Sequence, residues 1–344
     1  MNNWSFISHI TNYLARPRLG DQKAPTQWPS EASYSLLNEH NEETIVGKCR
    51  RSAFFRLLLD NYNFSPKYDV YKHLVEDINS RKLPTDPYLR WIWKQGELYE
   101  DYCVQMAKES GVFIAGQTAV YVPPLNVSGK IDLVVINPLT EKYQIVEVKS
   151  VYGFGANVVL GTPGQRKKGF LGEPRESHLM QLGVYQWWYA NAREEFGPSL
   201  LTYGARDTGR FAEYEVTVEE VEIDGVVQNY IFYQGNAPNR TPKVNSGITI
   251  EGMGDEYRAI AKSVDSGLAP KRDFKLMFSE DRLNTLHERG ELSKKDSEQL
   301  LKRKQQLAEG KTKLVKPVEK GDWQCRLCNY KNVCYNEDKS PREL

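Results

Sequence analysis

The chain has 344 residues, of which 40% are hydrophobic and 26% charged, a composition typical of a globular protein large enough for one or two domains. No apolar run approaches the roughly 20 residues that span a bilayer, and residues 1–20 lack the apolar stretch of a secretory signal, so neither a membrane protein nor an exported one is expected. The net charge of +1 excludes attraction of the whole molecule to nucleic acid, so any polyanion must bind a local patch.

The first part of the chain is predicted to be mostly helical. Residues 1–45 are polar and weakly periodic and are expected to wrap a surface. The stretch RRSAFFRLLLDNY, from Arg50, has the apolar spacing of a helix, and LRWIWKQGELYEDYCVQMAKESG predicts a long helix that stops at Gly111. Within it, GELYE places Glu100 four residues after Gly96, where a carboxylate could reach a metal ion or its waters; an exposed helix glutamate is the alternative.

Residues 129–150, GKIDLVVINPLTEKYQIVEVKS, predict a β-hairpin with a turn rich in Asn, Pro and Thr. Asp132 interrupts the first strand, and Glu147 and Lys149 interrupt the second. Residues two apart share a strand face, so Glu147 and Lys149 lie on one face and are expected to meet Asp132 at one end of the hairpin.

This arrangement suits a hard divalent cation, which takes oxygen ligands and keeps several waters. Asp132 and Glu147 could each supply a carboxylate, and the peptide carbonyl of Val148 a third oxygen. Such an ion polarises a phosphoryl oxygen and lowers the pKa of a bound water, and Lys149 could orient that water or offset negative charge. The alternative is an edge strand with solvated charges.

A glycine-rich, basic stretch at 152–175 has the composition of a loop and is longer than most loops in compact domains. Its position between the hairpin and the next helix, and its cations, predict that it guides single-stranded DNA by phosphate contacts. The residues expected to do so are Arg166, Lys167, Lys168 and Arg175.

The next segment, SHLMQLGVYQWWYANAREEF, predicts a helix with Ser177 as its N-cap. Gln181 and Tyr185 stand four residues apart and so share one helix face, with polar tips suited to a phosphate or a catalytic water. An ordinary amphipathic helix is the alternative. Strands are then predicted at 199–206 and 211–233, with an Asp-Gly hairpin turn in the second, and helices at 251–268 and 279–309.

Five cysteines without a secretory signal argue against a disulfide framework and favour a reducing compartment. Cys325, Cys328 and Cys334 form C-x2-C-x5-C, which favours a metal centre that needs a fourth ligand, and Cys49 lies far upstream. A structural zinc site is the alternative. Cys103 falls within a helical pattern and is expected to be a small buried apolar residue.

The order G-x-x-x-E, D, E-x-K and Q-x-x-x-Y over residues 96–185 resembles the RecB-like branch of the PD-(D/E)XK nucleases. The resemblance implies that Asp132 and Glu147 are metal ligands and that Lys149 is the catalytic lysine. It implies supporting roles for Glu100, Gln181 and Tyr185. Relatives from CRISPR adaptation systems usually have His at the position of Glu100.

One upstream cysteine followed by a C-terminal C-x2-C-x5-C resembles the iron–sulfur nucleases of that branch, which include AddB-type subunits and the CRISPR adaptation nucleases. The phrase WPSEAS, upstream of GKCRR, is similar to the start of phage-encoded members. The resemblance implies a [4Fe–4S] cluster that clamps the chain ends together, with the ligands Cys49, Cys325, Cys328 and Cys334.

The fold class expected is α/β, a restriction-endonuclease-like mixed central sheet flanked by helices, with an iron–sulfur lobe joining the N- and C-terminal regions. The expected regions are a helical one at 1–95 that contributes one cluster cysteine, a nuclease core at 96–250, and a helical and cysteine-bearing one at 251–344.

The expected function is a Mg²⁺- or Mn²⁺-dependent deoxyribonuclease, an exonuclease on single-stranded DNA or DNA ends, in the cytoplasm of a bacterium or a phage-infected cell. No P-loop occurs, so a helicase or recombination protein that worked with it would be a separate chain. The alternatives are a non-catalytic nucleic-acid-binding or assembly subunit that keeps the fold, and a site-specific restriction endonuclease.

Overall fold

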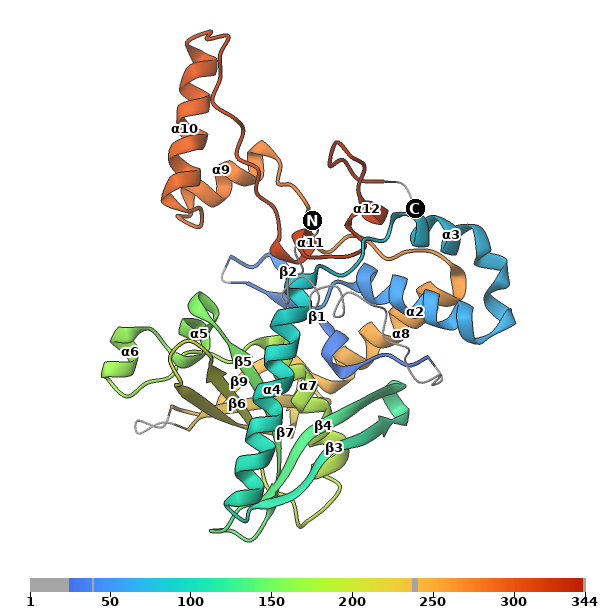
Figure 1. Ribbon diagram of the computed structural model, residues 1–344, viewed down its shortest axis with the longest axis vertical. Helices are drawn as coiled ribbons and strands as arrows, with labels where there is room; N and C mark the ends of the chain where they lie inside the picture. Colours follow the sequence, from blue (N-terminus) through green and yellow to red (C-terminus); the bar gives the residue numbers. More distant parts are fainter. Residues whose placement is uncertain (1–24, 39, 237–240, 343–344) are drawn as a thin grey trace, which may run out of the picture. The chain divides into compact units, whose positions relative to one another are not determined.

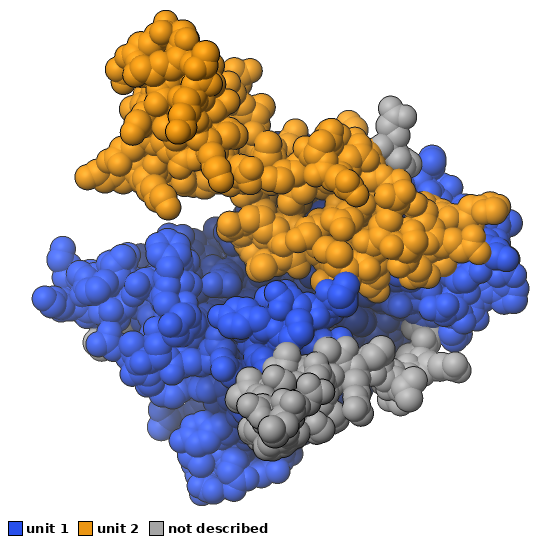
Figure 2. All heavy atoms as spheres, turned by 45° about the horizontal axis from the view of Figure 1, so that its top comes forward, with its two compact units in different colours: residues 1–72, 84–270 blue, residues 73–83, 271–344 orange. Residues whose placement is uncertain are grey.

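The computed structural model describes residues 25–38, 40–236 and 241–342. Residues 1–20, from which the lack of an export signal was inferred, lie outside this part of the chain. The described residues form two compact units, shown in different colours in Figure 2. Unit 1 takes its residues from 1–72 and 84–270, and unit 2 from 73–83 and 271–344.

Unit 1 is built on a seven-stranded sheet in which the strands follow one another in chain order (Figure 1). The pair β5–β6 is parallel and the other neighbours are antiparallel, so the sheet is mixed, as predicted. The strands are β3 (Phe113–Val122), β4 (Val127–Ile136), β5 (Tyr143–Val151), β6 (Ser199–Ala205), β7 (Phe211–Ile223), β8 (Val226–Gly235) and β9 (Val244–Thr249).

Helices cover both faces of this sheet. The helix α4 (Pro87–Glu109) begins at Asp86, whose side chain accepts a hydrogen bond from the Tyr88 N–H, and ends before Gly111, which has a φ of 78°. Val146 and Val148 of β5 pack with Ala107 of α4. Ile145 faces the other way, into the larger cluster of α7 (Glu176–Tyr185) and α8 (Ile250–Ser266). The predicted alternation along β5 is therefore confirmed.

Unit 1 also contains elements that the sequence did not predict. Residues 25–45 were expected to wrap a surface, and no strand was predicted there. They hold η1 (Pro29–Glu31), β1 (Ser33–Leu37) and the start of β2 (Glu43–Gly47), which pairs with β1. The helix predicted from Arg50 is present as α2 (Arg50–Phe64), and the short turns η2 (Pro66–Tyr71) and η3 (Pro123–Leu125) complete the unit.

The stretch 152–175 was predicted to be a loop, and this is wrong. It contains α5 (Gly153–Leu160), which buries Val159 and Leu160 in the core, and α6 (Pro163–Lys167). The side chain of Thr162 accepts the Gln165 N–H, and that of Gln165 accepts the Thr162 N–H, so a capping box starts α6.

Two helix boundaries also differ from prediction. Ser177 is not an N-cap, because α7 starts one residue earlier, and the helix continues through the π turn η4 (Gln186–Ala190). The predicted helix at 279–309 is two helices, α9 (Glu280–Glu288) and α10 (Lys294–Ala308), because Gly290 takes a positive φ between them.

Unit 2 combines these two helices with α3 (Lys72–Arg81), α11 (Trp323–Arg326) and α12 (Lys331–Cys334). The chain after α10 returns along that helix, held by a bond from the Arg303 guanidinium to the Val315 carbonyl. Residues 73–83 join the unit through the Arg342–Asp77 ion pair and a bond from the Leu83 N–H to Asn329 O. No helix in the described part of the chain is long and apolar enough to cross a membrane.

Candidate active site

The charged residues of the hairpin lie where β4 and β5 separate. The last ladder pair between the two strands is Leu133 and Val146, so Asp132 and Glu147 are the next opposed residues. Beyond this point β5 continues as the parallel partner of β6. Asp132 Oδ2 accepts the Val148 N–H at 3.0 Å and so takes the place of a missing ladder acceptor. The strand separation therefore brings both carboxylates to one end of the hairpin, as predicted.

These carboxylates are buried and face a single ammonium group. Glu147 is fully buried, and Asp132 is 6% exposed. Lys149 Nζ contacts Glu147 Oε1 and lies 4.0 Å from Asp132 Oδ2. Glu147 Oε2 is buried and has no hydrogen-bond partner among the described residues. A buried carboxylate oxygen without a partner is costly, and a cation or a water ligand at this point would remove the cost.

A third carboxyl group, that of Glu100 on α4, belongs to the same site. Burial and the charge and hydrogen bond of Asp132 raise the pKa of Glu100 to about 7. Burial also raises the pKa of Glu147, against the charge of Lys149. Burial alone would lower the pKa of Lys149, but the Glu147 and Asp132 carboxylates outweigh it and raise that pKa.

The raised pKa of Glu147 favours a neutral carboxyl, whereas the raised pKa of Lys149 favours a charged ammonium that faces a carboxylate. We assign the charged pair, since Lys149 Nζ is in direct contact with Glu147 Oε1. One ammonium cannot offset three ionised carboxylates, so the residues fit a site that takes up a divalent cation.

Gln181 and Tyr185 lie on α7, on the face of the sheet that also carries Glu147. Tyr185 is buried, and its hydroxyl is hydrogen-bonded with the Gln181 side chain and the Lys130 backbone. Burial and the charge of Glu147 raise the pKa of Tyr185, so it is a neutral phenol. A Cβ at Gly129 would collide with this hydroxyl, so a glycine is needed there. The sequence-predicted pair thus shares a helix face and contributes to the site.

The structure adds two residues that sequence reasoning missed. His178 Nδ1 lies 2.9 Å from the hydroxyl of Tyr203, which also accepts the Arg175 N–H at 3.1 Å. Tyr203 is the partner of Lys149 in the β5–β6 ladder. Burial, then the charges of Lys149 and Arg175, lower the pKa of His178 well below its usual value, so the ring is neutral. The spacing 178, 181 and 185 is the one sequence signal that marks His178.

The four basic residues of 152–175 have different surroundings. The Arg166 guanidinium donates to Asn157 Oδ1 at 3.2 Å and to the Gly161 carbonyl, so it stabilises the α5–α6 connection. Lys167 and Lys168 are exposed, and Arg175 occupies the N-cap position of α7. Their contact with nucleic acid stays a prediction.

The cysteines of the C-terminal motif are carried by α11, α12 and the turn between them. The Tyr330 N–H points at Cys328 Sγ, 3.4 Å away, and Cys328 N–H bonds to the Cys325 carbonyl. Cys49 is the N-cap residue of α2 in unit 1. Cys103 packs in the α4 cluster, where it is half-buried.

Within the residues that the structure describes, no three His, Cys, Asp or Glu side chains are grouped as a set that could hold a metal ion. At the hairpin end, the Lys149 ammonium is the cation against the two carboxylates.

The family model of the PD-(D/E)XK nuclease superfamily matches residues 36–335. The match covers most of the chain, includes the hairpin and agrees with the mixed sheet flanked by helices, so the chain belongs to this superfamily. Its members are typically metal-dependent nucleases that generally use Mg²⁺ or Mn²⁺. No curated protein and no solved structure gives a significant match to the chain.

Proposed function

We propose that the protein is a Mg²⁺- or Mn²⁺-dependent deoxyribonuclease that hydrolyses phosphodiester bonds in single-stranded DNA or at DNA ends, as an exonuclease. The observation that supports this proposal is the pair Asp132 and Glu147, buried where two strands separate, with Lys149 against both and one Glu147 oxygen without a partner among the described residues. A purely structural hairpin would gain stability from apolar residues at these positions.

The site residues have separate tasks in this proposal. Asp132, Glu147 and the Val148 carbonyl would hold the ion, and Glu100 would bind it or one of its waters. A bound Mg²⁺ or Mn²⁺ would polarise the phosphoryl oxygen and acidify a water. Lys149, held by Glu147, would place its ammonium against the negative charge that develops on the phosphate.

On the opposite side of the site, α7 would position the substrate. The Gln181 amide carries both donors and an acceptor for a phosphate oxygen or the attacking water. Tyr185 fixes that amide through its hydroxyl, and its neutral phenol adds no negative charge beside the phosphate. His178, neutral and bonded to Tyr203, would hold α7 against β6, the strand next to the one that bears Lys149.

We further propose that Cys49, Cys325, Cys328 and Cys334 ligate a [4Fe–4S] cluster, as in AddB-type subunits, CRISPR adaptation nucleases and their phage-encoded relatives. The C-x2-C-x5-C spacing and the backbone N–H directed at Cys328 Sγ support this, because such bonds stabilise metal-bound thiolates. The lobe would then include a cysteine from 1–95 and three from 251–344, on either side of a core at 96–250. A helicase or recombination protein would be a separate partner.

The deciding experiment is a cleavage assay on anaerobically purified protein with labelled single-stranded and duplex oligonucleotides and Mg²⁺ or Mn²⁺. We expect the wild-type protein to cleave, Lys149→Ala to be inactive, and Lys142→Ala to be active, since Lys142 is an exposed lysine at the other end of the hairpin. Iron, acid-labile sulfide and a visible absorption band should accompany the protein. A well-folded wild type that cleaves with neither ion would identify a non-catalytic subunit. Protein that contains zinc and no iron would identify a structural zinc site in place of the cluster.

A further inference from the structure

A groove of about 500 Å³ opens in unit 1 beside the candidate active site. This volume lies in the range of pockets that bind small molecules, so it could receive one nucleotide of a DNA chain. Its lining joins residues 28–30, the edge strand β3, its neighbour β4, and α7. The side chains that matter here are Trp28, Tyr121, Lys130, Gln181 and Tyr185. Because Gln181 and Tyr185 also belong to the candidate active site, groove and site are continuous.

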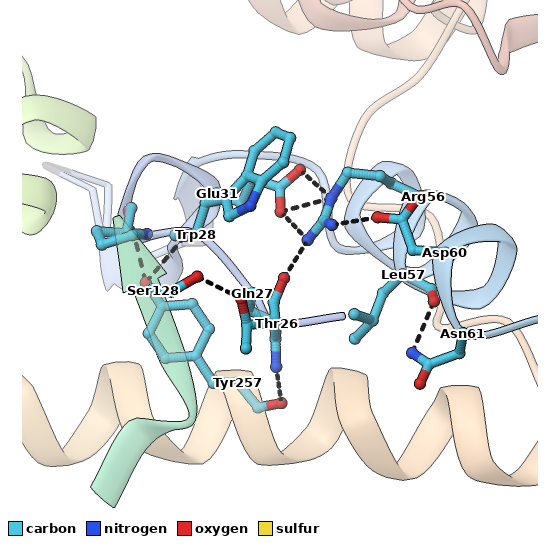
Figure 3. Close-up of polar contacts among 11 residues, drawn as sticks. Thr26, Gln27, Trp28, Glu31, Arg56, Leu57, Asp60, Asn61, Ser128 and Tyr257 are labelled. Carbon is cyan, nitrogen blue, oxygen red and sulfur yellow. Dashed lines mark hydrogen bonds and ion pairs between the residues drawn. The ribbon is translucent and has the colours of Figure 1, made fainter. Parts of the chain in front are cut away.

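The wall that carries Trp28 is fixed to the sheet. Gln27 forms a parallel bridge with Val127, and its carbonyl accepts the Ser128 N–H at 3.0 Å. The Gln27 side-chain amide donates to the Tyr257 carbonyl of α8 at 2.7 Å. The Thr26 and Ser128 hydroxyls are also in contact (Figure 3). The segment before η1 therefore has a defined position along β4.

Trp28 is supported by a neighbouring side chain although the residue is 47% exposed. The Arg56 guanidinium lies 4.2 Å from the centre of the indole ring, a cation–π contact (Figure 3). Arg56 is itself fixed by Glu31, at 2.8 Å from Nε to Oε1, and by Asp60, at 2.6 Å. Two carboxylates neutralise Arg56, so it supports the indole and is not available for a phosphate.

The chemistry of the groove matches an unpaired nucleotide. Trp28 and Tyr121, which is 51% exposed, offer aromatic faces on which a base can stack, and Lys130 is an exposed cation next to the site. In a duplex the base faces are already stacked within the helix. We propose that this groove binds one unpaired nucleotide beside the bond to be cleaved, with its base stacked on Trp28 and its phosphate near Lys130.

The test is DNA binding without cleavage, measured by fluorescence anisotropy in Ca²⁺ or in EDTA. The probe is a labelled oligothymidylate, compared with the same oligonucleotide carrying one abasic position at each place in turn. Stacking of one base typically contributes about 5- to 150-fold in affinity. Trp28→Leu should lose affinity in this range, and Trp28→Phe, which keeps an aromatic face, should recover most of it. Melting curves of both variants establish that they are folded.

The abasic probe separates stacking from a general loss of affinity. One abasic position should weaken binding to the wild-type protein, and Trp28→Leu should weaken binding to that probe no further. A Tyr121→Leu variant with the same pattern would assign the base to both rings. Equal loss on intact and abasic strands, or no loss in Trp28→Leu, would overturn the proposal.

This inference rests on the proposed function, but the two can fail separately. Binding is measured without turnover. A protein that binds the strand through Trp28 and never cleaves it would therefore support the groove proposal and refute the proposed nuclease function. A Trp28→Leu variant that cleaves normally and binds the single strand with unchanged affinity would support the nuclease function and refute the groove proposal. A wild type that binds no single strand refutes the groove.

Discussion

The two units of the chain are stabilised in different ways. Unit 1 buries apolar residues on both faces of its sheet, and one cluster extends from Val120 on β3 to Tyr257 on α8. Within the described part of unit 2, the cluster of α9 and α10 is limited to four leucines and Val318. Its cysteine segment buries Val333 and Tyr335 and also makes polar contacts, among them Arg272 Nη2 to the Cys334 carbonyl at 3.0 Å.

This difference predicts that the two units depend on a bound metal to different degrees for their stability. Asp132 and Glu147, which are buried, and Lys149 stand on the strands β4 and β5, whose neighbours are already packed. We therefore expect the site to keep its arrangement without an ion. A region with a small apolar core gains much of its stability from a staple such as a metal centre. We therefore expect loss of the hairpin charges to abolish activity and leave the fold intact. Loss of a cysteine should instead destabilise unit 2 and leave the hairpin site in place.

The largest expected effect is that of Glu147→Gln and Lys149→Ala on cleavage. Each should lower the turnover number by at least about 10²-fold, because Glu147→Gln removes a carboxylate that would hold the ion and Lys149→Ala removes the ammonium that would face the phosphate. The double variant should be hardly worse than either single one, since residues of one catalytic unit are not additive. Single-turnover rates measure this, with Lys142→Ala as the control. Full activity in Lys149→Ala would contradict the assignment of Lys149 as the catalytic lysine.

The second effect concerns unit 2. Cys328→Ser and Cys49→Ser should each lose iron, and α11–α12 should become protease-sensitive while the sheet of unit 1 keeps its melting temperature. A crosslink across a long chain segment contributes up to about 5 kcal/mol if the estimate for a disulfide is applied. Iron content, melting and limited proteolysis are the measurements, and Cys103→Ser should match the wild type. If Cys49→Ser retains all its iron, the fourth ligand is another residue.

A smaller effect is expected from the basic residues at the C-terminal end of α6 and its C-cap. Replacing Arg166, Lys167 and Lys168 by Gln should reduce the salt dependence of single-strand binding by about one to two units of slope, because each phosphate contact contributes about 0.7. Arg166 should contribute least, since its guanidinium is bonded within the segment. Neutralising Lys294, Lys295 and Lys302 of α10 removes the same charge from unit 2. Equal slopes in both triple variants would mean that neither segment has a special role.

The smallest effect is a pH dependence of unit 1. His178 has a lowered pKa in the folded protein because it is buried beside Lys149 and Arg175. Below its ordinary pKa of about 6.5 the unfolded chain binds a proton that the folded protein does not, so stability falls as the pH decreases from there towards the folded pKa. Urea unfolding between pH 5 and 7.5 should show this slope, and His178→Gln should flatten it. His73→Gln, at an exposed position in unit 2, should leave it unchanged.

Sequence reasoning succeeded wherever the signal was local. The hairpin turn, the alternation along β5 and the Asp224–Gly225 turn, with positive φ at both residues, follow from neighbouring side chains and backbone preferences. It failed at 152–175, because the capping box of Thr162 and Gln165 is a weaker signal than a high glycine content. It also missed the break at Gly290, where a single glycine separates two helical patterns.

By itself, then, the sequence determined the order of the motifs, the sign of the charges on each strand and the helix face shared by Gln181 and Tyr185. Only the tertiary structure decided that His178 and Trp28 lie around the same hairpin end, and that residues 73–83 pack with 271–344. The physical reason is range. Strand alternation and helix periodicity act over a few residues, whereas these meetings depend on how buried surfaces pack between segments far apart in the chain.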